Sequence, residues 1–500
     1  MASDPFASLI RKQTWQAGLH SLSGRLARPW RPTRLDPGRT GPANLLLVGV
    51  DTLRADHLGL AGHGSPTSPR LDGLAGRGTA FLDVTAPAPW TLPSFSSALT
   101  GLMPGLHGAF LAGTERNMDR QPPHRLDPQV VTLAAHLRRQ GYRTAAFYSN
   151  QFFAFGLAES FDHHRYLNFP AQDLARTALD WMRRHGDGPF FCFVLFNDPH
   201  EPTTPAPADL DAFLPAAGRP DPAFLRGLAR WGEDPAPALG AGPWPPAEAV
   251  AAALALKLAV YDATIHQVDR VIGSLQDQLE RWEMADRTLV SVFSDHGEEF
   301  LDHADFSRRW NHDPRGIHGI GHGHSLFREV LGVPWLAWGP GVPAGVRRRE
   351  PASLLDLSPT LLDWLELPSL PYPERIPEDM RPQLTGRSLA TARADDGLDD
   401  RIILSEAIAY GPDLVAARQG PWKLISHRDG RPLALFDLEK DGKERYDAAG
   451  DRPEIVRSLQ EVLARWERSG TGAEGDRPDG SWGDLDDTIR RRLKDLGYSS

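Results

Sequence analysis

The sequence predicts an α/β protein with a mainly parallel central sheet sandwiched by helices and a small antiparallel subdomain near the C-terminus. Short, continuous apolar runs alternate with helical patterns, which is typical of a sheet covered on both faces. After about residue 400 the pattern changes to short strands joined by turns. The chain has 500 residues, of which 41% are hydrophobic, so it can bury a large core.

The first expected strand is the apolar run NLLLVGVD at 44–51, which ends in an acid. Three further runs are expected to lie in the same sheet: YRTAAFYS at 142–149, PFFCFVLFNDPH at 189–200 and RTLVSVFSDHGEEF at 287–300. Each of the three follows a helix-like segment, at 131–141, 173–186 and 261–282 respectively. This alternation predicts parallel strands, because parallel neighbours need a crossover connection.

Polar residues directly follow three of these strands. Asp51 ends the first strand, Asp198 and His200 follow the third, and Asp295 and His296 follow the fourth. Ligands of such sheets bind beyond the carboxyl ends of the strands. We therefore expect these side chains to form one site.

The chain divides into segments by composition and pattern. They are an N-terminal extension at 1–42, a main domain at 43–400 with a Pro-, Ala- and Gly-rich irregular insertion at 201–248, a small β subdomain at 401–470, and a tail with a terminal helix at 471–500. The extension holds a basic stretch at 8–30, which we expect to pack as an arm on its own domain rather than on a membrane. Strand-like stretches at 401–410, 413–427 and 432–438 predict the antiparallel sheet of the subdomain.

Composition excludes several classes of protein. The formal net charge of -10, with acids and bases interspersed, argues against a nucleic-acid partner. The single cysteine, Cys192, lies in an apolar run, so we expect a buried thiol and no disulfide framework. No stretch is apolar enough for a transmembrane segment or a secretory signal, and we expect a cytoplasmic protein. The sequence leaves the oligomeric state open.

The stretch APWTLPSFSSALTG at 88–101 places a hydroxyl, that of Thr91, where a helix begins. Such a residue before Pro93 is either an ordinary helix cap or a nucleophile, and the stretch alone leaves both open. Elsewhere, SDHGEE places Asp295 and His296 side by side on a loop that Gly297 allows to turn. Together with Asp51, these carboxylate, imidazole and hydroxyl groups predict a divalent-cation site.

At this point the chain resembles the sulfatase family of the alkaline phosphatase superfamily. The motifs are VGVDTLRADHLG (48–59), PWTLPSFSSALTG (89–101), FNDPHEP (196–202), SDHGEEFLDH (294–303), GHGHSLFREVLGVPWLAWGPG (321–341), LLDLSPTLLDWL (354–365) and TGRSLA (385–390), followed late in the chain by GPWKLI and LFDLEKDGKE. The resemblance runs from about residue 43 to the end and implies an alkaline phosphatase-like fold.

The resemblance also implies roles for individual residues. Those implied to bind the cation are Asp51, Asp295, His296 and the nucleophile Thr91. Those expected to donate a proton or contact substrate are His200, His322, Arg54, Lys423, Asp198 and His303. The substrate is expected to be a small anionic ester. The other histidines near the SDHGEE motif, at 312, 318 and 324, are expected in a solvated loop, and Asp262 and Asp269 are expected to pack within a helix.

Three positions depart from the family pattern. Sulfate-cleaving members carry Cys or Ser where this chain has Thr91, and convert it to formylglycine, a conversion that we do not expect for threonine. Phe95 stands where the family has arginine, and Thr52 where it has a second aspartate. His296 replaces the amide usual in calcium-using members, which favours Zn²⁺ or Mn²⁺ and leaves Ca²⁺ or Mg²⁺ open.

The resulting prediction is a sulfatase-like, metal-dependent hydrolase that cleaves a sulfate or phosphate ester through Thr91. A threonine ester cannot collapse to an aldehyde and must be attacked again at its central atom, which is familiar for phosphoryl groups. Three alternatives remain. The same threonine could pass a phospho-headgroup to an acceptor, a second cation at Asp198, His200 and His322 could make a two-metal phosphodiesterase, or the fold could serve only for binding.

Overall fold

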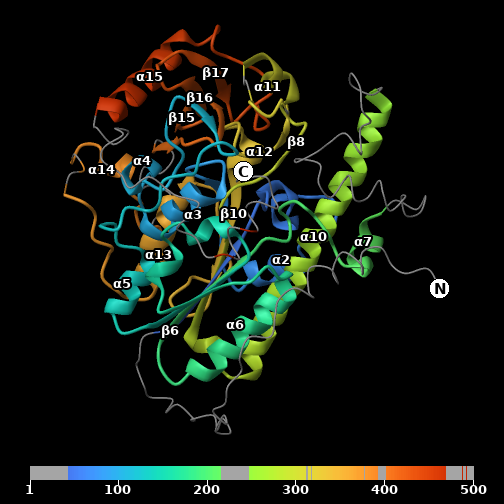
Figure 1. Cartoon of the computed structure of the whole chain (residues 1–500), viewed down its shortest axis with the longest axis vertical. Coiled ribbons are helices and arrows are strands. Elements are labelled where there is room, and N and C mark those ends of the chain that lie inside the picture. The colour runs from blue at the N-terminus through green and yellow to red at the C-terminus, as the bar shows by residue number, and fades with distance from the viewer. Residues whose placement is uncertain are drawn as a thin grey trace.

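In the computed structural model, the apolar run at Asn44–Val50 forms a strand, β1, near the middle of a nine-stranded sheet (Figure 1). The strands follow the order β11-β2-β10-β7-β1-β6-β4-β5, and β12 pairs with β2. The structure describes residues 43–214, residues 247–391 without 311, 312, 317, 375 and 377, residues 401–468, and residues 487 and 491.

The parallel centre of the sheet is the part that the sequence predicts. Strand β1 pairs in parallel with β6 (Phe190–Phe196) on one side and with β7 (Thr288–Ser294) on the other. Strands β4 (Arg143–Tyr148) and β5 (His163–Tyr166) continue it in parallel beyond β6. The predicted α/β class with a mainly parallel sheet is therefore confirmed.

The other edge of the sheet is mixed and was not foreseen. Strand β10 (Gly332–Trp338) runs antiparallel to β7 and to β2 (Gly78–Thr85). The short strands β11 (Val346–Arg348) and β12 (Ala352–Ser353) pair in parallel with β2. Because β10 is buried along nearly its whole length, its sequence does not show the alternation that marks an exposed antiparallel strand.

Helices cover both faces of the sheet (Figure 1). On one face the side chains of Leu46 and Val48 pack in a core with α2 (Pro69–Ala75), α6 (Ala171–His185) and α10 (Ala247–Arg281). On the other face the core holds residues of β1 together with residues of α3 (Thr91–Thr100), α5 (Leu133–Arg139) and α13 (Leu357–Trp364). Successive residues of β1 thus serve opposite cores, which explains its continuous apolar run.

The remaining elements are short. They are α4 (Pro104–His107), α7 (Pro207–Phe213), α11 (Ala304–Trp310), α12 (Arg328–Leu331), α14 (Arg381–Leu384), the pair β8 (Glu299–Phe300) and β9 (Ile320–Gly321), and the 3-10 helices η1 (Ala55–His57), η2 (Gly59–Ala61), η3 (Gln151–Ala154), η4 (Ala158–Ser160), η5 (Ala285–Arg287) and η6 (Leu354–Asp356).

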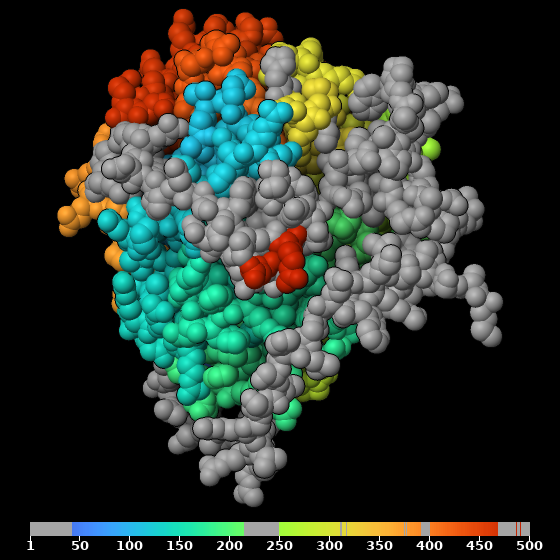
Figure 2. All heavy atoms as spheres, viewed as in Figure 1, coloured from blue at the N-terminus to red at the C-terminus, as the bar shows by residue number. Residues whose placement is uncertain are grey.

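The C-terminal part forms the predicted antiparallel sheet. Its strands are β13 (Ile402–Ser405), β15 (Leu414–Gln419), β16 (Trp422–His427) and β17 (Pro432–Asp437), in that order. Its partner helix α15 (Pro453–Arg468) was not foreseen, and it packs on the sheet through Leu459 and Trp466. Figure 2 shows these orange and red residues gathered at one end of the molecule.

The C-terminal sheet is continuous with the main core. Phe436 of β17 and Leu424 of β16 belong to the same apolar cluster as Leu45 of β1. The stretch expected as a strand at 401–410 is a strand only over β13, and a separate short strand that was not foreseen, β14 (Tyr410–Pro412), pairs with β3 (Glu115–Asn117). The boundary that the sequence suggested at residue 400 therefore does not separate two apolar cores.

Several expectations fall partly or wholly outside the described residues. The extension at 1–42, the stretch 215–246 of the insertion and the tail from 471 onward, apart from residues 487 and 491, are among them. Within the described part of the insertion, α7 corrects the expectation of wholly irregular structure, because Pro207 begins a helix whose residue Leu210 is buried. Across the described residues, every helix is too short or too polar to cross a bilayer.

Replacement of Phe95 by alanine is expected to lower the free energy of unfolding by about 3–5 kcal/mol. The ring is fully buried and contacts the rings of Phe153, Phe193 and Phe293 with edge-on geometry. Urea unfolding measures the loss. Phe213→Ala, at a partly exposed position, is the control and should cost far less; equal losses would contradict the packing described here.

Candidate active site

Three side chains from the loops after β1 and β7 converge at the carboxyl edge of the sheet. His296 Nε2 lies 3.3 Å from Asp51 Oδ1 and 3.3 Å from Asp295 Oδ2. All three side chains are completely buried. The two loops are tied together by Ser294, whose hydroxyl accepts from the Leu53 amide at 2.9 Å and donates to the His296 carbonyl at 2.8 Å.

Three of the four carboxylate oxygens of this cluster lack a hydrogen-bond partner. Asp51 Oδ1 and both carboxylate oxygens of Asp295 are buried and accept no hydrogen bond. Unpaired buried charges of one sign cost several kcal/mol each, so such an arrangement needs a positive charge. Carboxylate oxygens and an imidazole nitrogen within 4.8 Å of one another fit a divalent cation such as Zn²⁺ or Mn²⁺.

Burial shifts the pKa values of the cluster. Burial, followed by the charge of Asp51, raises the pKa of Asp295 well above its ordinary value, although nearby backbone N–H groups act in the opposite direction. Burial lowers the pKa of His296 to about 3, with the neighbouring His322 as a further cause. The His296 ring is therefore neutral at pH 7, which is the form that binds metals.

Thr91 is the first residue of α3 and joins this cluster. The helix is capped by Trp90 without any side-chain hydrogen bond, so the hydroxyl of Thr91 does not serve as the N-cap. Its Oγ1 lies 3.4 Å from His296 Nε2 and accepts from Asn150 Nδ2 at 3.2 Å. The same Nδ2 atom donates to Asp51 Oδ2 at 2.6 Å. Asn150 thus holds the hydroxyl and one carboxylate together.

Two further histidines lie next to the cluster. The ring of His322 is 4.5 Å from the ring of His296 and 5.0 Å from the ring of His200, centroid to centroid. His322 Nδ1 lies 3.1 Å from a carboxylate oxygen of Glu298, and His200 Nδ1 donates to the Glu201 carbonyl at 2.6 Å. Burial alone would lower the pKa of His200, but the charges of Asp51 and Glu298 raise it.

Two departures from the family pattern have visible structural consequences. Thr52, in the place of a second aspartate, has a φ of 56°, and its hydroxyl donates to the Asp51 carbonyl at 2.8 Å. This left-handed conformation is uncommon for a β-branched residue. Phe95, in the place of arginine, packs among aromatic rings in the core and brings no charge.

Two of the residues expected to contact substrate have other partners. The guanidinium of Arg54 pairs with Asp56 and Asp302, each at 2.8 Å. The carboxylate of Asp198 accepts from the Ala171 amide at the start of α6 and from Gln267 at 2.8 Å. Because Asp198 turns toward α6, the second cation site that would need it is not formed.

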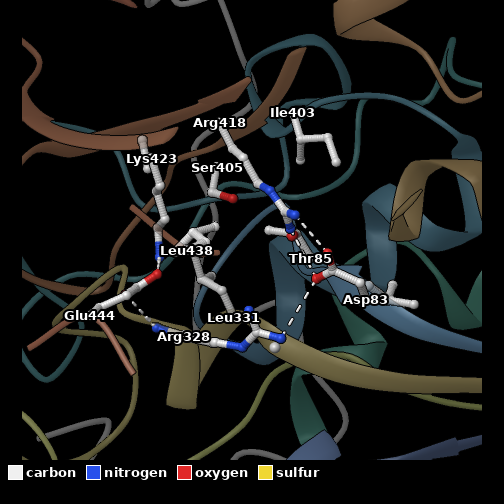
Figure 3. Close-up of a pocket in the computed structure, with 13 residues that line it drawn as sticks. Asp83, Thr85, Arg328, Leu331, Ile403, Ser405, Arg418, Lys423, Leu438 and Glu444 are labelled. Atoms are coloured by element: carbon white, nitrogen blue, oxygen red, sulfur yellow. Dashed lines mark hydrogen bonds and ion pairs between the residues drawn. The ribbon is translucent and has the colours of Figure 1, made fainter. Parts of the chain in front are cut away.

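Lys423 lies in a separate polar network that joins α12 to the C-terminal sheet (Figure 3), and His303 contacts the same network through Glu444. Lys423 Nζ donates to Glu444 at 2.7 Å, and the other oxygen of Glu444 accepts from the Arg328 amide at 2.9 Å. His303 lies 2.7 Å from a carboxylate oxygen of Glu329 and 2.9 Å from the Glu444 carbonyl. These polar groups are therefore occupied by the protein itself.

The other secondary expectations have mixed outcomes. His324 is buried and lies 2.8 Å from Glu299, so it is not solvated, and His312 lies outside the described residues. Cys192 is buried as expected. Asp269 packs as expected, accepting from the backbone amides of Arg70 and Leu71 at the start of α2.

Three residues of the site were missed in the sequence. Asn150 follows β4, so the strand-end rule that located Asp51 could have located it too. Glu298 lies inside the SDHGEE motif but carries no spacing signal of its own. Lys257 is in the apolar part of α10, where its ammonium is buried and donates to Glu201 at 2.5 Å. Only the folded chain brings that helix to the loop after β6.

Comparisons with known proteins agree with this geometry. The family profile described as Sulfatase matches residues 43–367. Human arylsulfatase K is 28% identical over 211 residues, which are 41% of this chain and 36% of that protein. Choline-sulfatase of Rhizobium meliloti is 32% identical over 191 residues, which are 38% of this chain and 32% of that protein. The matched part thus spans only about a third of either relative.

A solved structure extends the likeness to most of the chain. The phosphonate monoester hydrolase of Agrobacterium radiobacter superposes with a TM-score of 0.63, at 20% identity, covering 85% of this chain and 95% of that one. At this identity the similarity shows the fold alone. It confirms the predicted alkaline phosphatase-like architecture with its C-terminal antiparallel sheet.

The free energy of unfolding is expected to fall as pH rises from about 7 to about 9. Burial disfavours the charged form of His303, but Glu329 outweighs it and raises the pKa of His303 to about 9, above the ordinary value of 6.5. Between these two pKa values the folded state keeps a proton on His303 that the unfolded state releases. The stabilisation that this proton provides is lost as the pH rises to about 9. Urea unfolding at several pH values measures it.

In His303→Gln, this part of the pH dependence should disappear. His164→Gln, at an exposed position of β5, is the control and should keep it. An unchanged profile in His303→Gln would show that the proton resides elsewhere.

Proposed function

Because the chain belongs to the sulfatase family, we propose that it is a metal-dependent ester hydrolase in which Thr91 is the nucleophile. The substrate class is a small anionic ester, as the names of choline-sulfatase and phosphonate monoester hydrolase suggest for the similar proteins. One observation carries the proposal: the Thr91 hydroxyl lies at a buried pair of carboxylates, and three of their four oxygens have no hydrogen-bond partner.

The protein's own residues provide the nucleophile, the group that positions it and the proton donor. Thr91 Oγ1 attacks the central phosphorus or sulfur atom, and the bond to the leaving oxygen breaks. Asn150 donates to Oγ1 and keeps it at the start of α3, where backbone amides face an anion. His200 or His322 gives a proton to the leaving oxygen. Water then attacks the central atom and releases Thr91.

Asp51, Asp295 and His296 would hold the divalent cation, with Zn²⁺ or Mn²⁺ favoured by the imidazole ligand. When bound, such a cation favours ionisation of the threonine hydroxyl and neutralises charge on the transferred group. The buried carboxylates are too weakly solvated to remain charged and unpaired without it.

A phosphoryl or phosphonyl ester fits this site better than a sulfate ester. The threonine ester has no route back to an aldehyde, so the second step is another displacement at the central atom. The arginine expected near the anion is replaced by Phe95, whose ring is in the apolar core. The site therefore depends on the cation and the amides of α3 for its positive charge.

Thr91→Ala is expected to lower kcat/KM by on the order of 10³-fold or more, because it removes the attacking atom. The measurement is turnover of matched aryl phosphate, phosphonate and sulfate esters by the metal-loaded chain. Thr100→Ala is the matched control, because Thr100 is buried in the same helix and donates to the Ser96 carbonyl. The control should keep its activity.

Equal activity of wild type and Thr91→Ala would overturn the role of Thr91. Intact-mass measurement after a short incubation should detect a phosphoryl group on the wild type and none on the variant. If that group persists in water and leaves only when an alcohol is added, a transferase replaces the hydrolase.

Asp295→Asn is expected to weaken cation binding and to lower turnover, because an amide replaces one of the two charged carboxylates of the cluster. Chelation should inactivate the wild type, and Zn²⁺ or Mn²⁺ should restore it. Asp198→Asn is the control, since that carboxylate faces α6. Full activity of the chelated enzyme would contradict metal dependence.

A further inference from the structure

A second cluster of metal-binding side chains lies outside the active site. Asp262, on α10, contacts two histidines. Its Oδ1 lies 2.7 Å from His57 Nδ1, and its Oδ2 lies 2.9 Å from His63 Nε2. The two imidazole rings are 4.7 Å apart, centroid to centroid, with a tilt of 32°. One atom from each of the three side chains lies within 4.8 Å of the others.

We propose that His57, His63 and Asp262 bind a second divalent cation of the Zn²⁺ class. Two imidazole nitrogens and one carboxylate oxygen are a donor set that zinc sites use, with a water molecule in the fourth position. This site shares no residue with the cluster at Asp51 and Asp295, and it does not depend on the proposed activity.

The surroundings suit a metal site with access from solvent. His57 and Asp262 are buried, whereas the side chain of His63 is 20% exposed. The rings of His57 and Tyr261 pack edge to face, with 5.0 Å between their centroids. The backbone carbonyl of His57 accepts from the Thr67 hydroxyl at 2.5 Å. Buried ligands with fixed rings and one exposed ligand provide both a preformed geometry and a path for the ion.

The chain reaches this geometry through two short turns. His57 ends η1, and His63 follows η2 after Gly62, whose φ of 95° reverses the direction of the chain. As a result His57 and His63, which are six positions apart in the sequence, both contact Asp262 of the long helix α10. A cation there would cross-link the segment after β1 to α10.

That cross-link would lie close to the active site. Tyr261, the neighbour of Asp262, donates to the Thr52 carbonyl at 2.5 Å and accepts from the Arg54 amide at 3.0 Å. Thr52 directly follows the ligand Asp51. The second cation would therefore stabilise the loop that positions the first, which is a structural role and not a catalytic one.

The competing explanation is a pair of hydrogen bonds in which the Asp262 carboxylate merely bridges two rings. The two explanations differ in the amount of metal bound. Zn²⁺ binding to the metal-free full chain is measured by equilibrium dialysis and elemental analysis. Wild type should bind one equivalent more than His63→Gln, and Asp295→Asn should also lose one equivalent, independently.

His185→Gln is the matched control, because His185 is also partly exposed and bonds only to a backbone carbonyl in the described structure. It should bind as much Zn²⁺ as the wild type. In the Asp295→Asn background, Zn²⁺ should raise the melting temperature, and adding His63→Gln should abolish that rise.

A measurement on the wild type guards against misfolding of the variant. Diethyl pyrocarbonate should modify His63 in the metal-free chain, and Zn²⁺ should protect it, as mass spectrometry of the digested protein detects. Equal zinc content in wild type and His63→Gln, or modification of His63 at the same rate with and without Zn²⁺, overturns the proposal.

Discussion

The carboxylates of Asp51 and Asp295, buried on either side of His296 Nε2, impose the constraint on which the rest of the site depends. Two like charges placed in a dry environment repel each other and lose their hydration. The protein holds them there because each follows a central strand of the same parallel sheet. A divalent cation bound there would relieve this unfavourable arrangement, and the hydroxyl of Thr91 lies beside it.

The apolar core around Phe95 explains how the site is held and what it lacks. The ring of Phe95 packs against aromatic rings of the central strands β6 and β7. This packing anchors α3, whose first residue is Thr91. An arginine at the same position would place a positive charge in this apolar core. Phe95 instead contributes apolar packing and no charge.

The C-terminal sheet supports the main sheet without contributing a charged group to the cluster. Its Lys423 pairs with Glu444, and the same Glu444 receives the amide of Arg328 from α12. Arg418 of β15 pairs with Asp83 of β2 in the same way (Figure 3). These paired charges join the two sheets, whose apolar residues already share one core.

The sequence by itself determined the central parallel strands, the antiparallel C-terminal sheet, and the convergence of Asp51, Thr91, Asp295 and His296. The strands and the meeting of Asp51, Asp295 and His296 follow from local apolar patterns and from the rule that parallel strands end at one edge. The place of Thr91 was implied by the resemblance to the sulfatase family. It also predicted that His200 and His322 belong near the cluster, and both rings lie there.

Only the tertiary structure decided which polar side chains turn toward the cluster. Asp198 follows a strand as Asp51 and Asp295 do, yet it faces the start of α6, where it accepts from the Ala171 amide at the helix N-terminus. Lys257 reaches Glu201 from the apolar part of a helix that carries no motif, and Asp262 meets His57 across about two hundred residues. Such pairings depend on how helices pack over the sheet, which no local pattern encodes.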